Sequence, residues 1–184
     1  MSDALAFLVE NLSEGSRRAR QVSATRLAQI AKEQPESLVD YCDDFIDALN
    51  RPEAQTRWEC LDVLTCLLSL DSCSCEKAVS GAEAALFDEE SGALRLAAMR
   101  FLCALGSTSE DRSTKVWPLI DEAIQCYHGD LEFPDMLNAV IEFSEGNLDE
   151  SVRAALTERM SFDAKSGKGS LKRRAQQILD NTSK

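Results

Sequence analysis

An arginine that recurs at intervals of 37 and 38 residues, at Arg20, Arg57 and Arg95, constrains this fold more than any other feature. The residues four and seven positions after each arginine are small or apolar: Ala24 and Leu27, Leu61 and Leu64, and Met99 and Leu102. Side chains with this spacing share one face of an α-helix. Each arginine therefore marks an amphipathic helix, and a recurrence of this length is typical of a repeat protein.

Similar intervals, of 39 and then 38 residues, give two further copies that match less well. They lead to Pro134, followed by Asn138 and Ile141, and to Lys172, followed by Gln176 and Leu179. Terminal repeats are often atypical. We therefore interpret both positions as the starts of helices that carry an apolar stripe.

A second amphipathic helix precedes each of these helices. In PESLVDYCDDFIDALN the apolar side chains follow one helical face, at Leu38, Cys42, Phe45, Ile46 and Leu49. Similar stripes lie within 5–12, 79–86, 116–127 and 148–156. Asn50 and Arg51 then form a turn, and Pro52 suits the first position of the next helix. Because one hairpin of two helices is too thin to bury its own apolar face, we expect five hairpins to stack around a continuous core.

The segment 26–64, RLAQIAKEQPESLVDYCDDFIDALNRPEAQTRWECLDVL, holds two amphipathic helices, a short turn and an arginine followed by small and apolar residues. In this it resembles the HEAT and armadillo-type helical repeats. The resemblance implies an all-α fold, a right-handed α-solenoid of about five HEAT-like hairpins, in a single domain over 1–184. It also implies that the second helices line the concave side. Such a fold indicates a kind of surface and does not by itself name a ligand.

The charge of the chain limits the classes of partner. The 184 residues carry a net charge of -12, which repels phosphate polymers and anionic membranes. The N-terminal stretch lacks the charge pattern of a signal peptide, and no apolar run approaches the roughly 20 residues that span a bilayer. We therefore predict a cytoplasmic protein that binds neither nucleic acid nor membrane.

The seven cysteines indicate reduced thiols in the core and not a metal site. Their number is odd, and most lie among apolar residues. Cys73 and Cys75, in DSCSCEK, are expected in a loop. A structural zinc site needs several suitably spaced ligands, whereas the chain has one histidine, His128. We predict no metal site and no cofactor.

Two charged segments are interpreted as solvated surface. The acidic residues Asp40, Asp43, Asp44 and Asp47 lie opposite the apolar stripe of their helix, so we expect them on the outer surface and not in a catalytic carboxylate pair. The basic segment 165–174 does not match the phosphate-binding loop G-x-x-x-x-G-K-[ST]. We interpret it as a flexible loop before the last helix, although its glycines leave open the binding of an anion.

Trp58 and Asp62 are one helical turn apart and share a face, which Thr65 extends, while Leu61 and Leu64 face the core. A tryptophan beside a carboxylate is suited to binding a cation. In the other interpretation Trp58 packs against the next hairpin, and both remain open. Related positions on the other second helices complete the candidate binding surface: Gln21, Thr25, Leu96, Arg100, Asp135, Glu142 and Arg173.

These features predict a non-catalytic scaffold or adaptor that binds a protein partner along the concave surface. The identity of the partner and the oligomeric state stay open. The alternative is a HEAT-like DNA glycosylase for alkylated bases, a class that the sequence resembles in having a Trp and an Asp one turn apart. In that match Trp58 and Asp62 are joined by Arg95 or Arg100. A second tryptophan on the later concave helices is missing, and the net charge of -12 opposes DNA binding.

Overall fold

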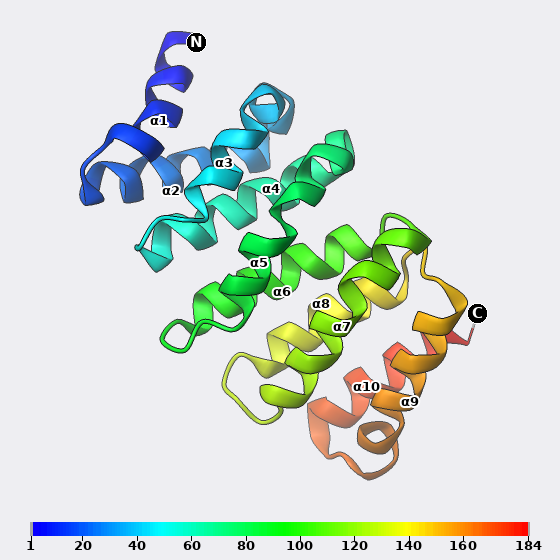
Figure 1. The fold of residues 1–184 in the computed structure, drawn as a ribbon. Coiled ribbons are helices and arrows are strands. Elements are labelled where there is room, and N and C mark those ends of the chain that lie inside the picture. The colour runs from blue at the N-terminus through cyan, green and yellow to red at the C-terminus, as the bar shows by residue number, and fades with distance from the viewer. Residues whose placement is uncertain (1, 184) are drawn as a thin grey trace. The chain divides into compact units, whose positions relative to one another are not determined.

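The structure, a computed structural model, describes residues 2–183 of the chain (Figure 1). Within this range the regular elements are all helices, and no strand is present. In chain order they are α1 (Ser2–Glu14), α2 (Arg17–Glu33), η1 (Pro35–Tyr41), α3 (Cys42–Ala48), α4 (Ala54–Cys75), η2 (Glu76–Ala78), α5 (Val79–Leu86), α6 (Gly92–Gly106), α7 (Glu110–Cys126), α8 (Phe133–Ser144), α9 (Glu150–Ser166) and α10 (Gly169–Thr182).

The helices of residues 2–183 follow one another as five hairpins, so the predicted all-α repeat fold is confirmed. The first hairpin is α1 with α2, and the last two are α7 with α8 and α9 with α10. In the second hairpin the 3-10 helix η1 and α3 together make the first helix, and α4 is the second. Asp71, at φ -147° and ψ 74°, breaks α4. The last turn of α4 then continues through η2 and α5 as the first helix of the third hairpin, which α6 completes.

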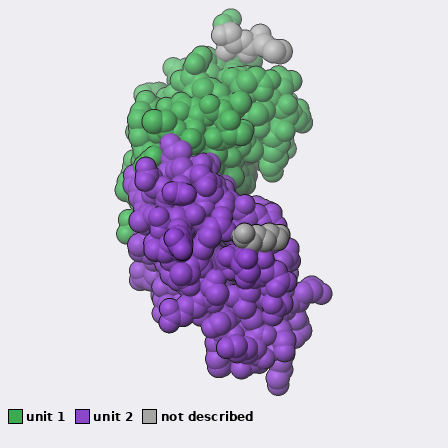
Figure 2. Space-filling view, turned by 90° about the vertical axis from the view of Figure 1, so that its right-hand side faces the viewer, with its two compact units in different colours: residues 1–101 green, residues 102–184 purple. Residues whose placement is uncertain are grey.

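The chain divides into two compact units, residues 1–101 and residues 102–184, which Figure 2 shows in different colours. The division falls inside α6. Helices α1 to α5 belong to unit 1, and α7 to α10 belong to unit 2. The single repeat domain over 1–184 stays a prediction, and each unit is described here by itself.

The core of unit 1 consists of the predicted apolar stripes. Leu27, Leu61 and Leu64 on the second helices are 0% exposed, and so are Leu38 and Phe45 on the first helix of the second hairpin. Helix α2 packs on α4, and α1 packs on α3. Neighbouring hairpins therefore bury each other's apolar faces, as a repeat architecture requires.

Two of the recurring arginines of unit 1, Arg20 and Arg57, tie a second helix to the following hairpin. Arg20 forms an ion pair with Glu53, whose side chain is 4% exposed, and it also donates to the carbonyl oxygen of Gly15 at 2.7 Å. This pairing with Arg20 lowers the pKa of Glu53. One repeat later, Arg57 donates to Asp88 at 3.3 Å. Arg20 and Arg57 are thus each the partner of an acid in the next hairpin.

Unit 2 is built in the same way from α7 to α10. Helix α9 packs on both α7 and α10, and α10 also packs on α8. Phe143 is 0% exposed, and a Cβ atom on Gly106 would lie 2.7 Å from its ring, so glycine permits this close approach. Between the first helices, Arg159 donates to Asp121 at 2.6 Å. These contacts join the two hairpins of the unit.

The predicted helical register of the last two repeats is wrong by one residue. The buried side chains are Leu137 and Val140 on α8, and Ala175 and Ile178 on α10. Asn138 and Gln176, which the prediction had assigned to the apolar stripe, are exposed, and Ile141 and Leu179 are half-buried. The residues equivalent to the arginines are therefore Phe133 and Leu171, which continue the spacing of 38 residues after Arg95. Both are apolar, so no arginine marked the position.

Three local predictions also need correction. Helix α4 begins at Ala54, two residues after Pro52. Cys73 and Cys75 do not lie in a loop: both belong to the last turn of α4, and Cys75 is 0% exposed. The basic segment 165–174 is largely helical, because α9 extends to Ser166 and α10 begins at Gly169. In the outer acidic segment the four aspartates are exposed, as predicted.

The register of α10 is tested by two adjacent substitutions of similar size. We expect Ile178→Ala to lower the free energy of unfolding by about 2–5 kcal/mol, because it leaves a cavity in the core of unit 2. Leu179→Ala removes a half-buried side chain and should cost less than half as much. Chemical denaturation of both variants measures the difference. A larger loss for Leu179→Ala would restore the register predicted from the sequence.

Candidate functional site

The side of α2, α4 and α6 that faces solvent, up to residue 101, is called here the second-helix surface of unit 1. It contains seven of the candidates that the sequence predicted: Gln21, Thr25, Trp58, Asp62, Thr65, Leu96 and Arg100. Arg100 is exposed and the others are half-buried. The remaining candidates belong to unit 2 and are described separately below.

A lateral set of hydrogen bonds joins α2 to α4 on this surface. The hydroxyl group of Thr25 donates to Glu59 at 2.8 Å and accepts from the side chain of Gln55 at 3.2 Å. Gln55 and Glu59 are not among the residues predicted from the sequence, although they are four residues apart and share a helical face. The hydroxyl of Thr65 donates to the carbonyl oxygen of Leu61 at 2.8 Å, so its donor is already used within α4. Thr25 and Thr65 therefore serve mainly to fix the surface.

The carboxylate of Asp62 is different, because it has no such partner. It is half-buried and forms no hydrogen bond or ion pair with the residues that the structure describes. Burial raises the pKa of Asp62, and Glu59 raises it further, while Lys32 and Arg100 act in the opposite direction. Lys32, which lies near the end of α2, is not among the residues predicted from the sequence. A partly desolvated charge without a partner is costly to the fold and typical of a functional site.

Trp58 lies one turn before Asp62 on α4 and is half-buried. Its ring is therefore neither a fully buried core residue nor a freely exposed one. The indole N–H makes no hydrogen bond with any residue from 2 to 183. Trp58 and Asp62 together present an aromatic ring, an unused donor and an unpaired carboxylate on one helical face.

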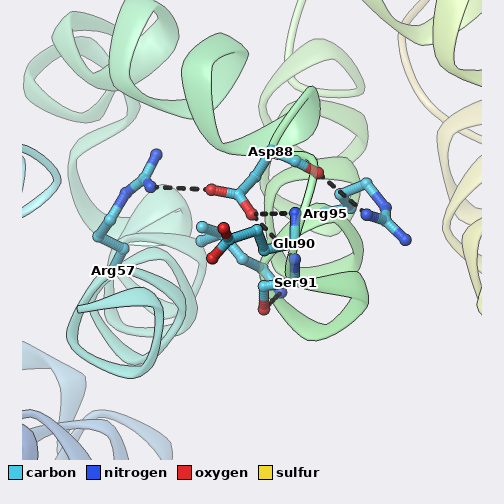
Figure 3. A network of polar contacts seen from close by, with 6 residues as sticks. Arg57, Asp88, Glu90, Ser91 and Arg95 are labelled. Atoms are coloured by element: carbon cyan, nitrogen blue, oxygen red, sulfur yellow. Dashed lines mark hydrogen bonds and ion pairs between the residues drawn. The ribbon is translucent and has the colours of Figure 1, made fainter. Parts of the chain in front are cut away.

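A polar network next to Trp58 fixes α4 against the start of α6 (Figure 3). The Asp88 carboxylate accepts from Arg57 at 3.3 Å and from the backbone N–H of Ser91 at 2.9 Å. The carbonyl oxygen of Asp88 accepts from Arg95 at 2.9 Å. Arg57 and Arg95 are thus engaged in structure, which leaves Arg100 as the candidate arginine of this surface that faces solvent.

Three candidates lie in unit 2 and are exposed: Asp135 and Glu142 on α8, and Arg173 on α10. Asp135 accepts from Asn138 at 3.4 Å, within α8. Arg173 borders a shallow hollow of about 440 Å³ whose other lining residues are Gly169, Lys172, Gln176, Gln177 and Asp180. In the corrected register the positions equivalent to Trp58 and Asp62 are Pro134 and Asn138 on α8. Unit 2 therefore does not repeat the arrangement of aromatic ring and carboxylate.

Unit 1 also contains a hollow that the sequence did not suggest. Its volume is about 570 Å³, and residues of α1, α2 and η1 line it, among them Leu5, Ile30 and Tyr41.

Within residues 2–183, no group of three or more His, Cys, Asp or Glu side chains is arranged to hold a metal ion. The same range holds no helix whose length and apolar character would let it cross a membrane.

Comparison with known proteins relates the chain to others through its fold. No family model matches the sequence, and no curated protein is significantly similar to it. Solved structures do match over nearly the whole chain. A designed armadillo repeat protein in complex with the peptide (KR)4 is 16% identical, with a TM-score of 0.80, over 98% of this chain and 82% of that chain.

Two further structures support the same fold. A computationally designed armadillo repeat protein for modular peptide recognition is 15% identical, with a TM-score of 0.76, over 97% of this chain and 82% of that chain. An engineered protein is 16% identical, with the same TM-score, over 97% of this chain and 79% of that chain. At such low identity the likeness shows the fold alone, and the predicted resemblance to armadillo and HEAT-type repeats is confirmed at that level.

The unusual state of Asp62 leads to a prediction on stability. Because its pKa is raised in the folded protein, the ionised carboxylate destabilises the fold at neutral pH. We expect Asp62→Asn to raise the melting temperature at pH 7. This gain should shrink as the pH falls through the folded pKa, and it should vanish below the ordinary pKa of about 3.9, where the carboxyl is protonated in both states.

A charge-matched control is Asp47→Asn, which removes one negative charge from an exposed position on α3. Thermal melts between pH 3 and 7 compare the two variants. A loss of stability in Asp62→Asn, or a gain no larger than that of Asp47→Asn, would show that Asp62 is not strained.

Proposed function

Because the chain has the helical repeat fold of the armadillo and HEAT type, we propose that it is a non-catalytic scaffold or adaptor that binds a protein partner. The second-helix surface of unit 1 is the binding surface in this proposal, and the partner contributes a segment that carries Lys or Arg. One observation carries the proposal: the half-buried carboxylate of Asp62 forms no hydrogen bond or ion pair with the described residues and lies one turn from Trp58.

A cationic side chain is chemically suited to bind both Trp58 and Asp62. An ammonium or guanidinium group supplies the hydrogen bonds that Asp62 lacks, and such charge-assisted bonds are stronger than neutral ones. The same cation on the face of Trp58 gains about 0.5–2 kcal/mol from the aromatic ring. The unused indole N–H remains available to a carbonyl oxygen of the bound segment. Interface energy concentrates in such aromatic anchors, so Trp58 is the expected main contact.

The charge of the whole chain favours the same class of partner. A net charge of -12 attracts basic segments over a distance and repels nucleic acids and anionic membranes. The designed armadillo repeat protein of the same fold is in complex with (KR)4, a peptide of alternating basic residues. That likeness supports a basic peptide as the first ligand to test. A cytoplasmic location stays a prediction.

The DNA glycosylase remains the second candidate, because a half-buried carboxylate with a raised pKa beside a tryptophan also suits a catalytic acid. Two observations count against the enzyme. Arg95, one of the two arginines in that match, is already bonded to Asp88, and the net charge of -12 opposes DNA binding. We expect weak binding to plain and alkylated duplexes and no release of alkylated bases. Tight, steeply salt-dependent binding, with base release that Asp62→Asn abolishes, would favour the enzyme instead.

The binding prediction uses a fluorescently labelled (KR)4 peptide as the probe. We expect Trp58→Ala to weaken binding by roughly 30-fold, which corresponds to about 2 kcal/mol, because the anchor ring is lost. Asp62→Asn should also weaken binding by more than Asp47→Asn, which removes the same charge outside the site. Fluorescence anisotropy at physiological salt measures all three variants.

Thermal melting of the same variants separates binding from folding. A half-buried tryptophan outside the core leaves most of the stability intact when it is removed. If Trp58→Ala instead lowers stability by about 3–5 kcal/mol, and the folded fraction binds the peptide normally, Trp58 is a packing residue. Equal losses of affinity in Asp62→Asn and Asp47→Asn would mean that the peptide responds only to the net charge of the protein. The proposed binding site at Trp58 and Asp62 would then be wrong.

A further inference from the structure

Two buried thiols of unit 1 lie in contact although they are 33 residues apart in the chain. The sulfur atoms of Cys42 and Cys75 are 3.8 Å apart. Cys42 is the first residue of α3 and is 5% exposed, and Cys75 is the last residue of α4 and is 0% exposed. Both cysteines are in the reduced form, without a disulfide bond. They belong to the first helices of two neighbouring hairpins and are unrelated to the peptide surface proposed above.

The local structure is arranged to bring this pair together. The break at Asp71 redirects the chain, and the Asp71 carboxylate accepts from the backbone N–H of Ser74 at 3.0 Å. An ion pair of 3.0 Å between Lys77 and Asp43 joins the same two segments beside the thiols. Cys75 also lies 3.7 Å from the carbonyl oxygen of Leu64. The Lys77–Asp43 pair therefore links the two segments that carry the sulfurs, and the turn at Asp71 positions Cys75.

The chemistry of Cys42 suits a first step of oxidation. The hydrogen bond from Cys75 lowers the pKa of Cys42 in spite of burial. The two other buried cysteines, Cys60 and Cys103, differ because burial strongly raises their pKa. Since the thiolate is the reactive form, Cys42 is the more reactive of the buried thiols.

We propose that Cys42 and Cys75 are a redox-sensitive thiol pair that hydrogen peroxide converts to a disulfide between the second and third hairpins. The Cys42 thiolate attacks one peroxide oxygen, which breaks the O–O bond, forms a sulfenic acid and releases hydroxide. The Cys75 thiol then loses its proton and attacks the Cys42 sulfur, which forms the S–S bond and expels hydroxide. The two protons lost by the two thiols convert the two hydroxide ions to water. In total two thiols lose two hydrogen atoms, and one peroxide becomes two molecules of water.

The disulfide would act as a clamp on unit 1. It closes a loop between residues 42 and 75, which removes freedom from the unfolded chain and stabilises the folded one. We expect the melting temperature to rise on the order of 10 °C.

The test treats the full-length protein with hydrogen peroxide and then blocks the remaining thiols by alkylation. Peptide mapping without reductant should recover Cys42 joined to Cys75, with the loss of two hydrogen atoms, and dithiothreitol should reverse both this link and the rise in melting temperature. Cys42→Ser should abolish the rise. Cys73→Ser, which changes an exposed cysteine two residues from Cys75, should keep it.

Two results would overturn the proposal. In one, peroxide oxidises the exposed Cys73 or Cys126 while Cys42 and Cys75 stay open to alkylation in the unfolded protein. In the other, a Cys42–Cys75 disulfide forms but the melting temperature does not change. Because both readouts come from the unsubstituted protein, a variant that fails to fold does not weaken the test.

Discussion

The burial of each hairpin's apolar stripe against the next hairpin is the constraint on which the rest of this structure depends. One hairpin has too little depth to exclude water from side chains such as Leu61 and Phe45, so the core exists only between repeats. The ion pairs of Arg20 with Glu53 and of Arg57 with Asp88 fix the approach of successive hairpins. Because the stacking uses one face of each second helix, the opposite face is left to solvent and is available for binding.

The two sides of unit 1 then acquire different properties. The second helices hold Trp58 and the unpaired carboxylate of Asp62 in place through packing and through the lateral bonds of Thr25. A carboxylate that is kept half-buried without a partner lowers stability, a cost that is common where a surface is shaped for a ligand. The first helices carry the contact between Cys42 and Cys75. In this account the second helices select the partner, and the thiol pair on the first helices adjusts the rigidity of the unit.

Burial explains both the successes and the failures of prediction from the sequence. The stripes after Arg20, Arg57 and Arg95 were identified because core packing imposes a helical period on residue types. Phe133 and Leu171 occupy the position of the arginine in the last two repeats. Because both are apolar, they do not mark that position, and the predicted helical register of these repeats is wrong by one residue. The pair of Trp58 and Asp62 followed from spacing within one helix. Lys32 and Glu59 acquire their influence on Asp62 from the packing of separate helices, which spacing alone does not reveal.

The central claim is that a cationic segment binds against Trp58, and tryptophan fluorescence tests it most directly. The chain has two tryptophans, and Trp117 stacks on Phe143 in unit 2, so Trp117→Phe keeps an aromatic ring there and leaves Trp58 as the only tryptophan. Titration of this variant with unlabelled (KR)4 should change the Trp58 emission in a saturable way and protect the ring from acrylamide quenching. Peptide binding by calorimetry, with unchanged emission and quenching of Trp58, would contradict the account.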